Sequence, residues 1–400
     1  MRGSITALLA VQLSLVACGA PSSRAADDDD DDVSPDSSTL TPDGPQTTAD
    51  GPGMQVAEDC SSYPFLAETL YAERVGFGRH ATGGDWNLPY HVTTLASTGT
   101  GSLRAALESP KKYWIVFDVN GLINLGEDSI HVLSNKTIDG RGRDITIDGQ
   151  LKLDPGTKNI IFTDLKLQDP SGFETSAGDM IGIRGHGNDD PELYDSRDMW
   201  FHHLELARGG DGQLDNRGAT FITLSWSHLH SHAKSMLHTN DTDNLPSRGN
   251  RTTYHHNFFD QTTRRGPQFH WGKADFFNNY HYRWYEYGAA GQKESQFLSE
   301  ANVYEARPGE YCFDCTDPNS PTGDSDFEVS KVALTPMWDS DPGFVKSVGD
   351  VARQGAILEQ RMPEVVFDRA DFYPAVIEPA DDALIEVLKT KTGPRRTYCQ

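Results

Sequence analysis

Four stretches of this chain resemble one another, and their spacing limits the folds that the chain can adopt. They are residues 199–206, 222–229, 252–259 and 274–281. Trp200, Thr223, Thr253 and Asp275 stand at equivalent places, at intervals of 23, 30 and 22 residues. One β unit per 20 to 30 residues is typical of a β-solenoid, in which successive turns stack and bury their inward side chains together. The repeat therefore predicts stacked turns of short strands.

The rest of the chain agrees with this prediction. Short β-rich runs such as 114–117 and 159–162 are separated by turns, and the best helical pattern is short, at 102–107. An antiparallel sandwich is the alternative, but sandwiches lack resemblance between successive strands. The longer 30-residue interval predicts an extended loop near 240–250, and such loops line binding surfaces on solenoids. The pattern at 306–400 is mixed, and we expect this segment to wrap around the solenoid.

The first residues have the features of an export signal. Arg2 precedes the mostly apolar run 5–16, which is too short to span a bilayer. The run ends in Leu-Val-Ala-Cys-Gly, which resembles the bacterial lipoprotein cleavage box and would make Cys18 a lipid-anchored first residue. An ordinary signal peptide is the alternative. We expect 1–17 to be the signal, 18–62 a disordered acidic linker rich in Pro, Ser and Thr, and 63–400 the folded domain of a secreted or cell-surface protein.

Charge and cysteines narrow the possible partners. Against 35 Lys and Arg stand 59 Asp and Glu, a net charge of −24, which argues against nucleic acid. An acidic ligand would need a local basic patch or a bridging cation. Four cysteines besides Cys18 in an exported chain predict structural disulfides, with three possible pairings, although Cys-x-x-Cys also occurs in zinc and redox sites. They are Cys60, Cys312, Cys315 and Cys399.

An ordered set of motifs resembles the pectate lyases of polysaccharide lyase family one. The motifs run in the family's order from about residue 72 to 305, and each of them is weak alone. They are 76–84 (GFGRHATGG), 92–93 with 100–104 (TGSLR), 137–142 (TIDGRG), 200–203, 211–215 (DGQLD), 232–234 (HAK), 255–257 and 278–280. The resemblance implies an all-β fold, a right-handed single-stranded parallel β-helix, which agrees with the repeat. It also implies an enzyme that cleaves an acidic polysaccharide, polygalacturonate or pectin, as a monomer.

Three aspartates are candidate calcium ligands. In a straight strand Asp211 and Asp215 would lie about 13 Å apart, too far to share an ion. Gly212 between them allows a bend that brings both carboxylates inward, and Asp179 lies one turn earlier. An isolated Asp-Gly pair is usually only a turn, but the resemblance implies that these three residues bind Ca²⁺. Ala177 stands where relatives have a further acidic residue.

The resemblance also implies roles for four cationic or polar residues. Lys234 would bind a substrate carboxylate and stabilise the charge that develops, and Arg265 would be the catalytic base. An arginine is ordinarily always protonated, so this role needs an unusual environment. Gln268 and His270 replace two family arginines, which leaves His270 and the neighbouring Arg264 as candidate substrate-binding residues. Histidine is charged only at lower pH, so specificity or pH dependence could differ.

Paired histidines and matching asparagines have structural interpretations. Neighbouring residues on a strand point to opposite faces, so we expect one member of His202-His203, and of His255-His256, to pack inside and the other outside. A histidine metal site is therefore not expected. Asn257 and Asn279 stand at matching places and predict a stacked asparagine ladder.

We therefore expect calcium-dependent β-elimination of polygalacturonate, which leaves an unsaturated product. A non-catalytic surface protein that binds acidic glycans is one alternative, motivated by Gln268 and His270. A pectin lyase acting on methylated pectin is another, and Asp211 and Asp215 argue against it. Preferred methylation, endo or exo action and the source organism stay open.

Overall fold

The computed structural model describes residues 63–126, 129–168, 178–239, 248–308, 330–336 and 341–395. The expected signal peptide, Cys18 and the linker lie outside this part of the chain, as do most of the expected 240–250 loop and all the cysteines of the predicted disulfides. No helix among the described residues is long and apolar enough to cross a membrane.

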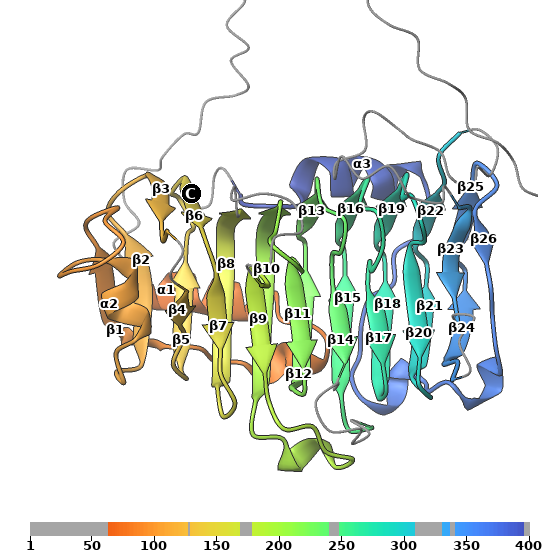
Figure 1. Ribbon diagram of the computed structural model, residues 1–400, viewed down its shortest axis with the longest axis horizontal. Coiled ribbons are helices and arrows are strands. Elements are labelled where there is room, and N and C mark those ends of the chain that lie inside the picture. The colour runs from red at the N-terminus through yellow and green to blue at the C-terminus, as the bar shows by residue number, and fades with distance from the viewer. Residues whose placement is uncertain are drawn as a thin grey trace, which may run out of the picture. The chain divides into compact units, whose positions relative to one another are not determined.

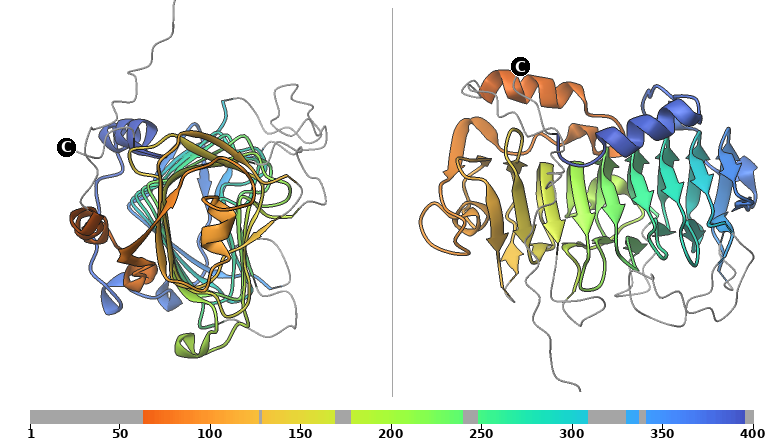
Figure 2. Two further views of the ribbon diagram at one scale, coloured as in Figure 1. Left: turned by 90° about the vertical axis from the view of Figure 1, so that its left-hand side faces the viewer. Right: turned by 90° about the horizontal axis from the view of Figure 1, so that it is seen from above.

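The described chain coils into a right-handed parallel β-helix, and all strand pairs between successive turns are parallel (Figures 1 and 2). A nine-stranded sheet forms one face of the coil and a 17-stranded sheet forms the rest. The nine strands are β4 (Ile130–His131), β7 (Leu151–Leu153), β9 (Ile181–Arg184), β11 (Leu214–Arg217), β14 (Leu237–Thr239), β17 (Gln268–His270), β20 (Ala289–Gln292), β23 (Val332–Thr335) and β26 (Ile357–Leu358).

The 17-stranded sheet contains two ladders, which the long strands β8 (Lys158–Gln168) and β10 (Arg197–Ala207) join because each runs through both. The first ladder has β1 (Asp85–Val92), β2 (Tyr113–Phe117), β5 (Lys136–Asp139), β12 (Thr220–Ser225), β15 (Arg251–His255), β18 (Lys273–Phe277), β21 (Gln296–Glu300) and β24 (Phe344–Val348). The second has β3 (Gly121–Asn124), β6 (Ile145–Asp148), β13 (His228–His230), β16 (Phe258–Asp260), β19 (Tyr280–Tyr282), β22 (Val303–Glu305) and β25 (Val351–Arg353).

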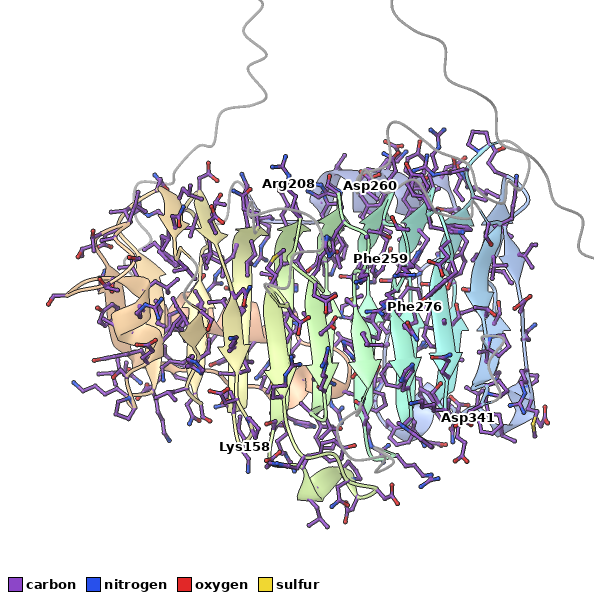
Figure 3. All side chains as sticks on the ribbon, viewed as in Figure 1. Lys158, Arg208, Phe259, Asp260, Phe276 and Asp341 are labelled. Carbon is purple, nitrogen blue, oxygen red and sulfur yellow. The ribbon has the colours of Figure 1, made fainter. Side chains whose placement is uncertain are left out.

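The register of these ladders confirms the sequence repeat. Trp200 pairs with Thr223, Thr223 with Thr253, and Thr253 with Asp275, as the four similar stretches predict. Within each turn alternate side chains enter the coil, where a continuous apolar core joins neighbouring turns. Phe259 and Phe276, labelled in Figure 3, belong to this core with ring centroids 5.9 Å apart.

Helices α1 (Tyr63–Ala72) and α3 (Asp382–Lys391) lie outside the coil and cover parts of the 17-stranded sheet, whereas α2 (Leu103–Leu107) contributes Leu103, Ala106 and Leu107 to the main core. α1 contributes Ala67 and Leu70 to a small apolar cluster with Trp200, and α3 packs on the turns around Tyr280 (Figure 2). The expected short helix is present as α2, capped by the Ser102 hydroxyl, which accepts from the Ala105 N–H. Short 3₁₀ turns are η1 (Phe77–His80), η2 (Pro191–Leu193), η3 (Pro363–Val365) and η4 (Arg369–Asp371).

The predicted asparagine ladder is confirmed and is longer than expected. Asn257 N–H donates to Asn279 Oδ1 at 2.9 Å, and Asn279 N–H donates to Asn302 Oδ1 at 2.7 Å. The ladder continues to Ser227 at one end and Asp350 at the other. All three asparagines are buried, so each turn satisfies polar groups of the next turn.

Candidate active site

The outer face of the nine-stranded sheet brings the predicted site residues together. Leu214 and Phe269 enter the core, so by alternation Asp215 and His270 point outward from β11 and β17. Before these strands begin, Gly212, Lys234 and Arg264 pair side by side on successive turns. The site is therefore built where three turns enter one sheet, at the strands' amino ends.

The three predicted calcium ligands lie on neighbouring turns. Asp179 immediately precedes the turn into β9, and Asp211 donates its N–H to the carbonyl of Gly178. The Asp215 carboxylate folds back toward Gly212. The two lie so close that a Cβ added at Gly212 would be only 2.2 Å from Asp215 Oδ1. The bend that the sequence predicts at Gly212 is present, and only glycine leaves room for this carboxylate.

Asp215 is the member of the set whose charge is least compensated. Its side chain is fully buried, Oδ1 accepts from Leu237 N–H at 2.9 Å, and Oδ2 has no hydrogen-bond partner. Burial, reinforced by the charge of Asp179, raises the pKa of Asp215 well above its usual value. A buried polar atom without a partner costs stability unless something binds it. This geometry therefore marks a place where a cation is favourable.

The donor set fits a hard cation. Asp179, Asp211 and Asp215 offer only carboxylate oxygens, which suit Ca²⁺ better than zinc. The chain's own cations partly compensate two of these carboxylates: Arg184 Nη2 lies 3.1 Å from Asp179 Oδ2, and Lys234 Nζ lies 3.3 Å from Asp211 Oδ1. The three residues could therefore hold Ca²⁺, with the remaining positions left to water or ligand oxygens.

The predicted cations lie beside the carboxylates. Lys234 is partly exposed and pairs in register with Arg264, which forms an ion pair with Glu286 at 2.9 Å. Arg265 has a left-handed backbone, φ 59°, and its buried Nε has no hydrogen-bond partner. The same backbone conformation recurs elsewhere in the coil, as at Trp271 and Asn278, so it belongs to the turns of this fold and does not by itself mark a site.

His270 lies in a hydrogen-bonded cluster with two glutamines and a tyrosine. Its Nε2 lies 2.5 Å from Gln292 Oε1 and 3.1 Å from Gln268 Nε2. Gln268 Nε2 donates to Gln292 Oε1 at 2.7 Å, and the Tyr287 hydroxyl donates to Gln268 Oε1 at 2.9 Å. The replaced family arginines thus have amide and imidazole groups in their place.

The sequence did not reveal Arg184, Glu286 or Gln292 as members of this face. Arg184 and Glu286 pair with Asp179 and Arg264, and Gln292 joins His270 from the next turn. Arg217 pairs in register with Arg184, so two guanidinium groups leave the sheet side by side. The sequence offered one indication for Arg217: it stands two residues after Asp215 on the same strand, so the two side chains point to the same face.

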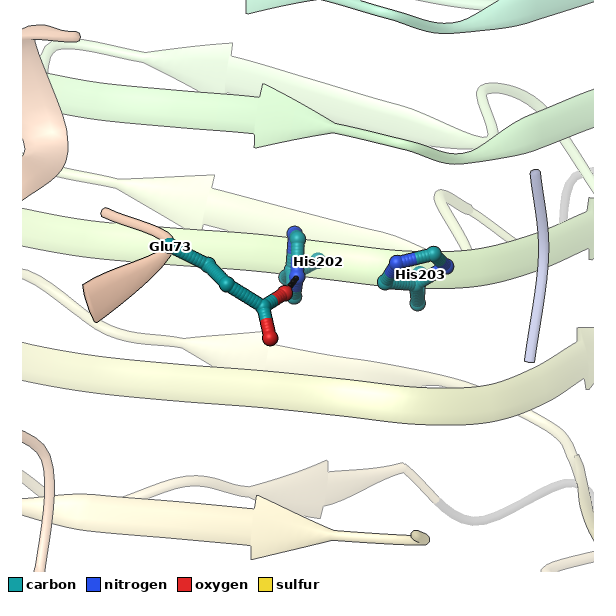
Figure 4. A group of neighbouring side chains, drawn as sticks. All are labelled: Glu73, His202 and His203. Atoms are coloured by element: carbon teal, nitrogen blue, oxygen red, sulfur yellow. Dashed lines mark hydrogen bonds and ion pairs between the residues drawn. The ribbon is translucent and has the colours of Figure 1, made fainter. Parts of the chain in front are cut away.

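The expectation for the paired histidines is wrong. His203 has φ 49°, so alternation fails there, and the His202 and His203 rings meet at 4.4 Å with Glu73 beside them (Figure 4). His255 and His256 likewise meet at 5.2 Å, with φ 54° at His256.

These neighbours form a group that geometry alone would allow to hold a metal ion. However, both Glu73 oxygens accept from Arg395 Nη1, at 3.0 and 2.9 Å, and His202 Nε2 lies 2.7 Å from Glu73 Oε2. His203 Nδ1 lies 2.8 Å from the Gly393 carbonyl. A metal ion would have to displace a guanidinium group that already neutralises the carboxylate. We therefore interpret this cluster as structural.

Comparison with known proteins identifies the family of this chain. The family model described as "Pectate lyase" matches residues 123–318, which include all the predicted site residues. "Putative pectate lyase 21" of Arabidopsis thaliana is 30% identical over 311 residues, covering 73% of this chain and 79% of the relative. The chain belongs to the pectate lyase family. A tobacco (Nicotiana tabacum) pectate lyase is 31% identical, over 58% of this chain and 61% of its own length.

Solved structures confirm the fold of this family member. The major allergen from cedar pollen, jun a 1, superposes with a TM-score of 0.64 at 23% identity, covering 84% of this chain and 97% of the allergen. A pectate lyase from Bacillus sp. N165, solved in complex with trigalacturonate, superposes with a TM-score of 0.53 at 20% identity, covering 80% and 98%. Both confirm the parallel β-helix.

Proposed function

We propose that this pectate lyase family member cleaves polygalacturonate by calcium-dependent β-elimination. The observation that carries the proposal is the unpartnered, buried Oδ2 of Asp215 opposite Asp179, on the same sheet face as Lys234 and Arg265. A chain of net charge −24 repels a polyuronate unless local cations compensate. Asp179, Asp211 and Asp215 would hold Ca²⁺, which would offset the charge of a uronate carboxylate and so make its C5 proton more acidic.

Lys234 and Arg265 have different roles in the proposed reaction. Lys234 binds the uronate carboxylate and stabilises the negative charge that grows on it. Arg265 removes the C5 proton, and the electron pair left behind forms the C4–C5 double bond as the bond from C4 to the glycosidic oxygen breaks. The leaving oxygen takes a proton and becomes a hydroxyl group. No water is consumed, so the product carries a new double bond.

Ultraviolet absorbance tests this proposal directly. Purified protein incubated with polygalacturonate and calcium at alkaline pH should gain absorbance from the conjugated double bond, and a chelator should abolish the gain. Lys234→Ala and Arg265→Ala should each slow the reaction by about 10²- to 10⁴-fold, the usual contribution of a positioned proton-transfer or charge-stabilising group. Binding of polygalacturonate without turnover by the unaltered protein would instead identify a glycan-binding surface protein.

We also propose that the protein is exported and held at a membrane through a lipid on Cys18, as a monomer. The support for export and for the anchor is the sequence of residues 1–19, and the monomer is what the family resemblance implies. Cell fractionation of the full chain and of Cys18→Ala tests the anchor: the variant should move from the membrane to the soluble fraction. An unchanged distribution would favour an ordinary signal peptide.

A further inference from the structure

The outer face of the nine-stranded sheet is neutral on one side of the candidate active site. Gln268 and His270 leave β17 there, and Gln292 leaves β20 in register with His270. Hydrogen bonds link these side chains to one another and to Tyr287. Neither β17 nor β20 contributes a lysine, an arginine or a carboxylate.

The opposite side of the same face is charged. There β9 and β11 contribute Arg184 and Arg217 in register, next to Asp179 and Asp215. Arg264, which precedes β17, is held in an ion pair with Glu286 at 2.9 Å. The two sides therefore offer different surroundings to the sugars that flank a bound uronate.

A polysaccharide that contacts both Lys234 and Arg265 crosses from one turn to the next, because these residues lie on neighbouring turns. Arg265 itself leads into β17, and the next turn in the same direction is that of β20. A carboxylate placed there would lose water and would meet amide and imidazole groups rather than a lysine or arginine of β17 or β20, in the field of a strongly acidic chain. A methyl ester carries no charge, and its carbonyl can accept a hydrogen bond from an amide or imidazole N–H.

We propose that the sugar position over β17 and β20 accepts a methyl-esterified galacturonate, so that the preferred substrate is partly esterified galacturonan. This inference rests on the proposed lyase function. The reacting uronate itself keeps a free carboxylate for the cations around Asp215 and Lys234. Gln268, His270 and Gln292 are the residues that determine specificity.

Initial rates on galacturonans of graded esterification, with calcium at alkaline pH where imidazole is neutral, test the inference. kcat/KM should be highest on partly esterified substrate and should fall on both the unesterified and the fully esterified polymer. His270→Arg places a cation in the cluster and should shift the preference toward unesterified substrate by on the order of tenfold, the value of one charge-assisted hydrogen bond. Ala352→Arg adds the same charge at an exposed position of β25 and should leave the preference unchanged.

The unaltered enzyme supplies a second measurement if His270→Arg does not fold. Mass spectrometry of its products from partly esterified substrate should find methyl esters enriched at one of the two sugars that flank the cleaved residue. Highest activity on unesterified polymer, with esters depleted at both flanking sugars, would overturn the inference and leave the lyase proposal intact. Highest activity on fully esterified pectin would also overturn it. Absence of cleavage of every polymer would overturn the proposed function itself.

Discussion

Two clusters of carboxylates and cations lie on different faces of this β-helix, and only one of them is electrostatically complete. The closed cluster lies under α1 and consists of Glu73, Asp164, His202, His203 and Arg395. The open cluster lies on the nine-stranded sheet and consists of Asp179, Asp211, Asp215 and Lys234. Both contain buried acids close to other titratable groups, so proximity alone does not distinguish a structural cluster from a site.

The difference lies in how each acid is compensated. In the closed cluster Arg395 binds Glu73 through Nη1 and Asp164 through Nε and Nη2, at distances of 2.8 to 3.0 Å. The guanidinium lowers the pKa of Asp164 despite complete burial. In the open cluster, burial and the charge of Asp179 raise the pKa of Asp215. An acid whose pKa is raised, with an oxygen left without a partner, is a candidate for a functional group rather than a structural one.

The closed cluster should dominate stability. Arg395→Ala would leave Asp164 buried without a cation, which typically costs about 3–5 kcal/mol. Urea unfolding measures this loss, and calcium binding should survive it in the folded fraction. Arg353→Ala is the matched control, since it breaks an exposed pair with Asp382 and should cost less than about 1 kcal/mol. Equal costs for the two variants would mean that the closed cluster contributes no more than a surface ion pair.

The second-largest effect should be a loss of stability at acid pH that comes from the closed cluster. Burial, aided by the charge of Arg395, lowers the pKa of His203 to about 4. The unfolded chain therefore binds this proton below about pH 6.5 while the folded chain does not. Stability from His203 is complete above pH 6.5 and declines as the pH falls toward 4, by on the order of 3 kcal/mol in total. Urea midpoints from pH 7 to 4 should fall less steeply in His203→Gln, whereas His131→Gln, at an exposed position, should match the unaltered protein.

The sequence predicted the stacked turns of the β-helix better than it predicted the ion pairs and the uncompensated charges. Trp200, Thr223 and Thr253 could be aligned in advance because stacked turns repeat one backbone register. The bend at Gly212 could also be anticipated, because Asp211 and Asp215 need it to approach each other. These are local consequences of spacing.

Contacts between residues that are far apart in the sequence could not be predicted in the same way. Arg395 and Glu73 are 322 residues apart, and they meet only because the C-terminal segment returns along the coil. The histidine prediction failed for a local reason, the left-handed backbone at His203, which a strict alternation rule does not include. Arg184 and Gln292 joined the site through neighbouring turns rather than through any motif.

Calcium should stabilise the protein through the open cluster alone. A ligand present at 100 times its dissociation constant adds about 2.7 kcal/mol to the free energy of unfolding. Thermal unfolding with and without calcium should show this shift in the unaltered protein and in Glu73→Gln. Asp215→Ala should abolish the shift because it removes a ligand from the set. A calcium shift lost in Glu73→Gln and kept in Asp215→Ala would reverse the assignment of the two clusters.

The smallest expected change in the free energy of unfolding is that of Asp215→Asn, and the sign of this change distinguishes the two clusters. In calcium-free buffer at neutral pH, Asp215→Asn removes a buried charge, while the amide oxygen can still accept from Leu237 N–H and the amide nitrogen can donate toward Asp179. The variant should therefore be more stable by about 1 kcal/mol, as expected when a functional site carries uncompensated charge. The matched change in the closed cluster, Asp164→Asn, removes a charge that Arg395 compensates and should be destabilising. If the two Asp→Asn variants changed the free energy of unfolding in the same direction, the two clusters would not differ as their geometry indicates. Changes in opposite directions would distinguish a functional site from a structural ion pair without the use of any substrate.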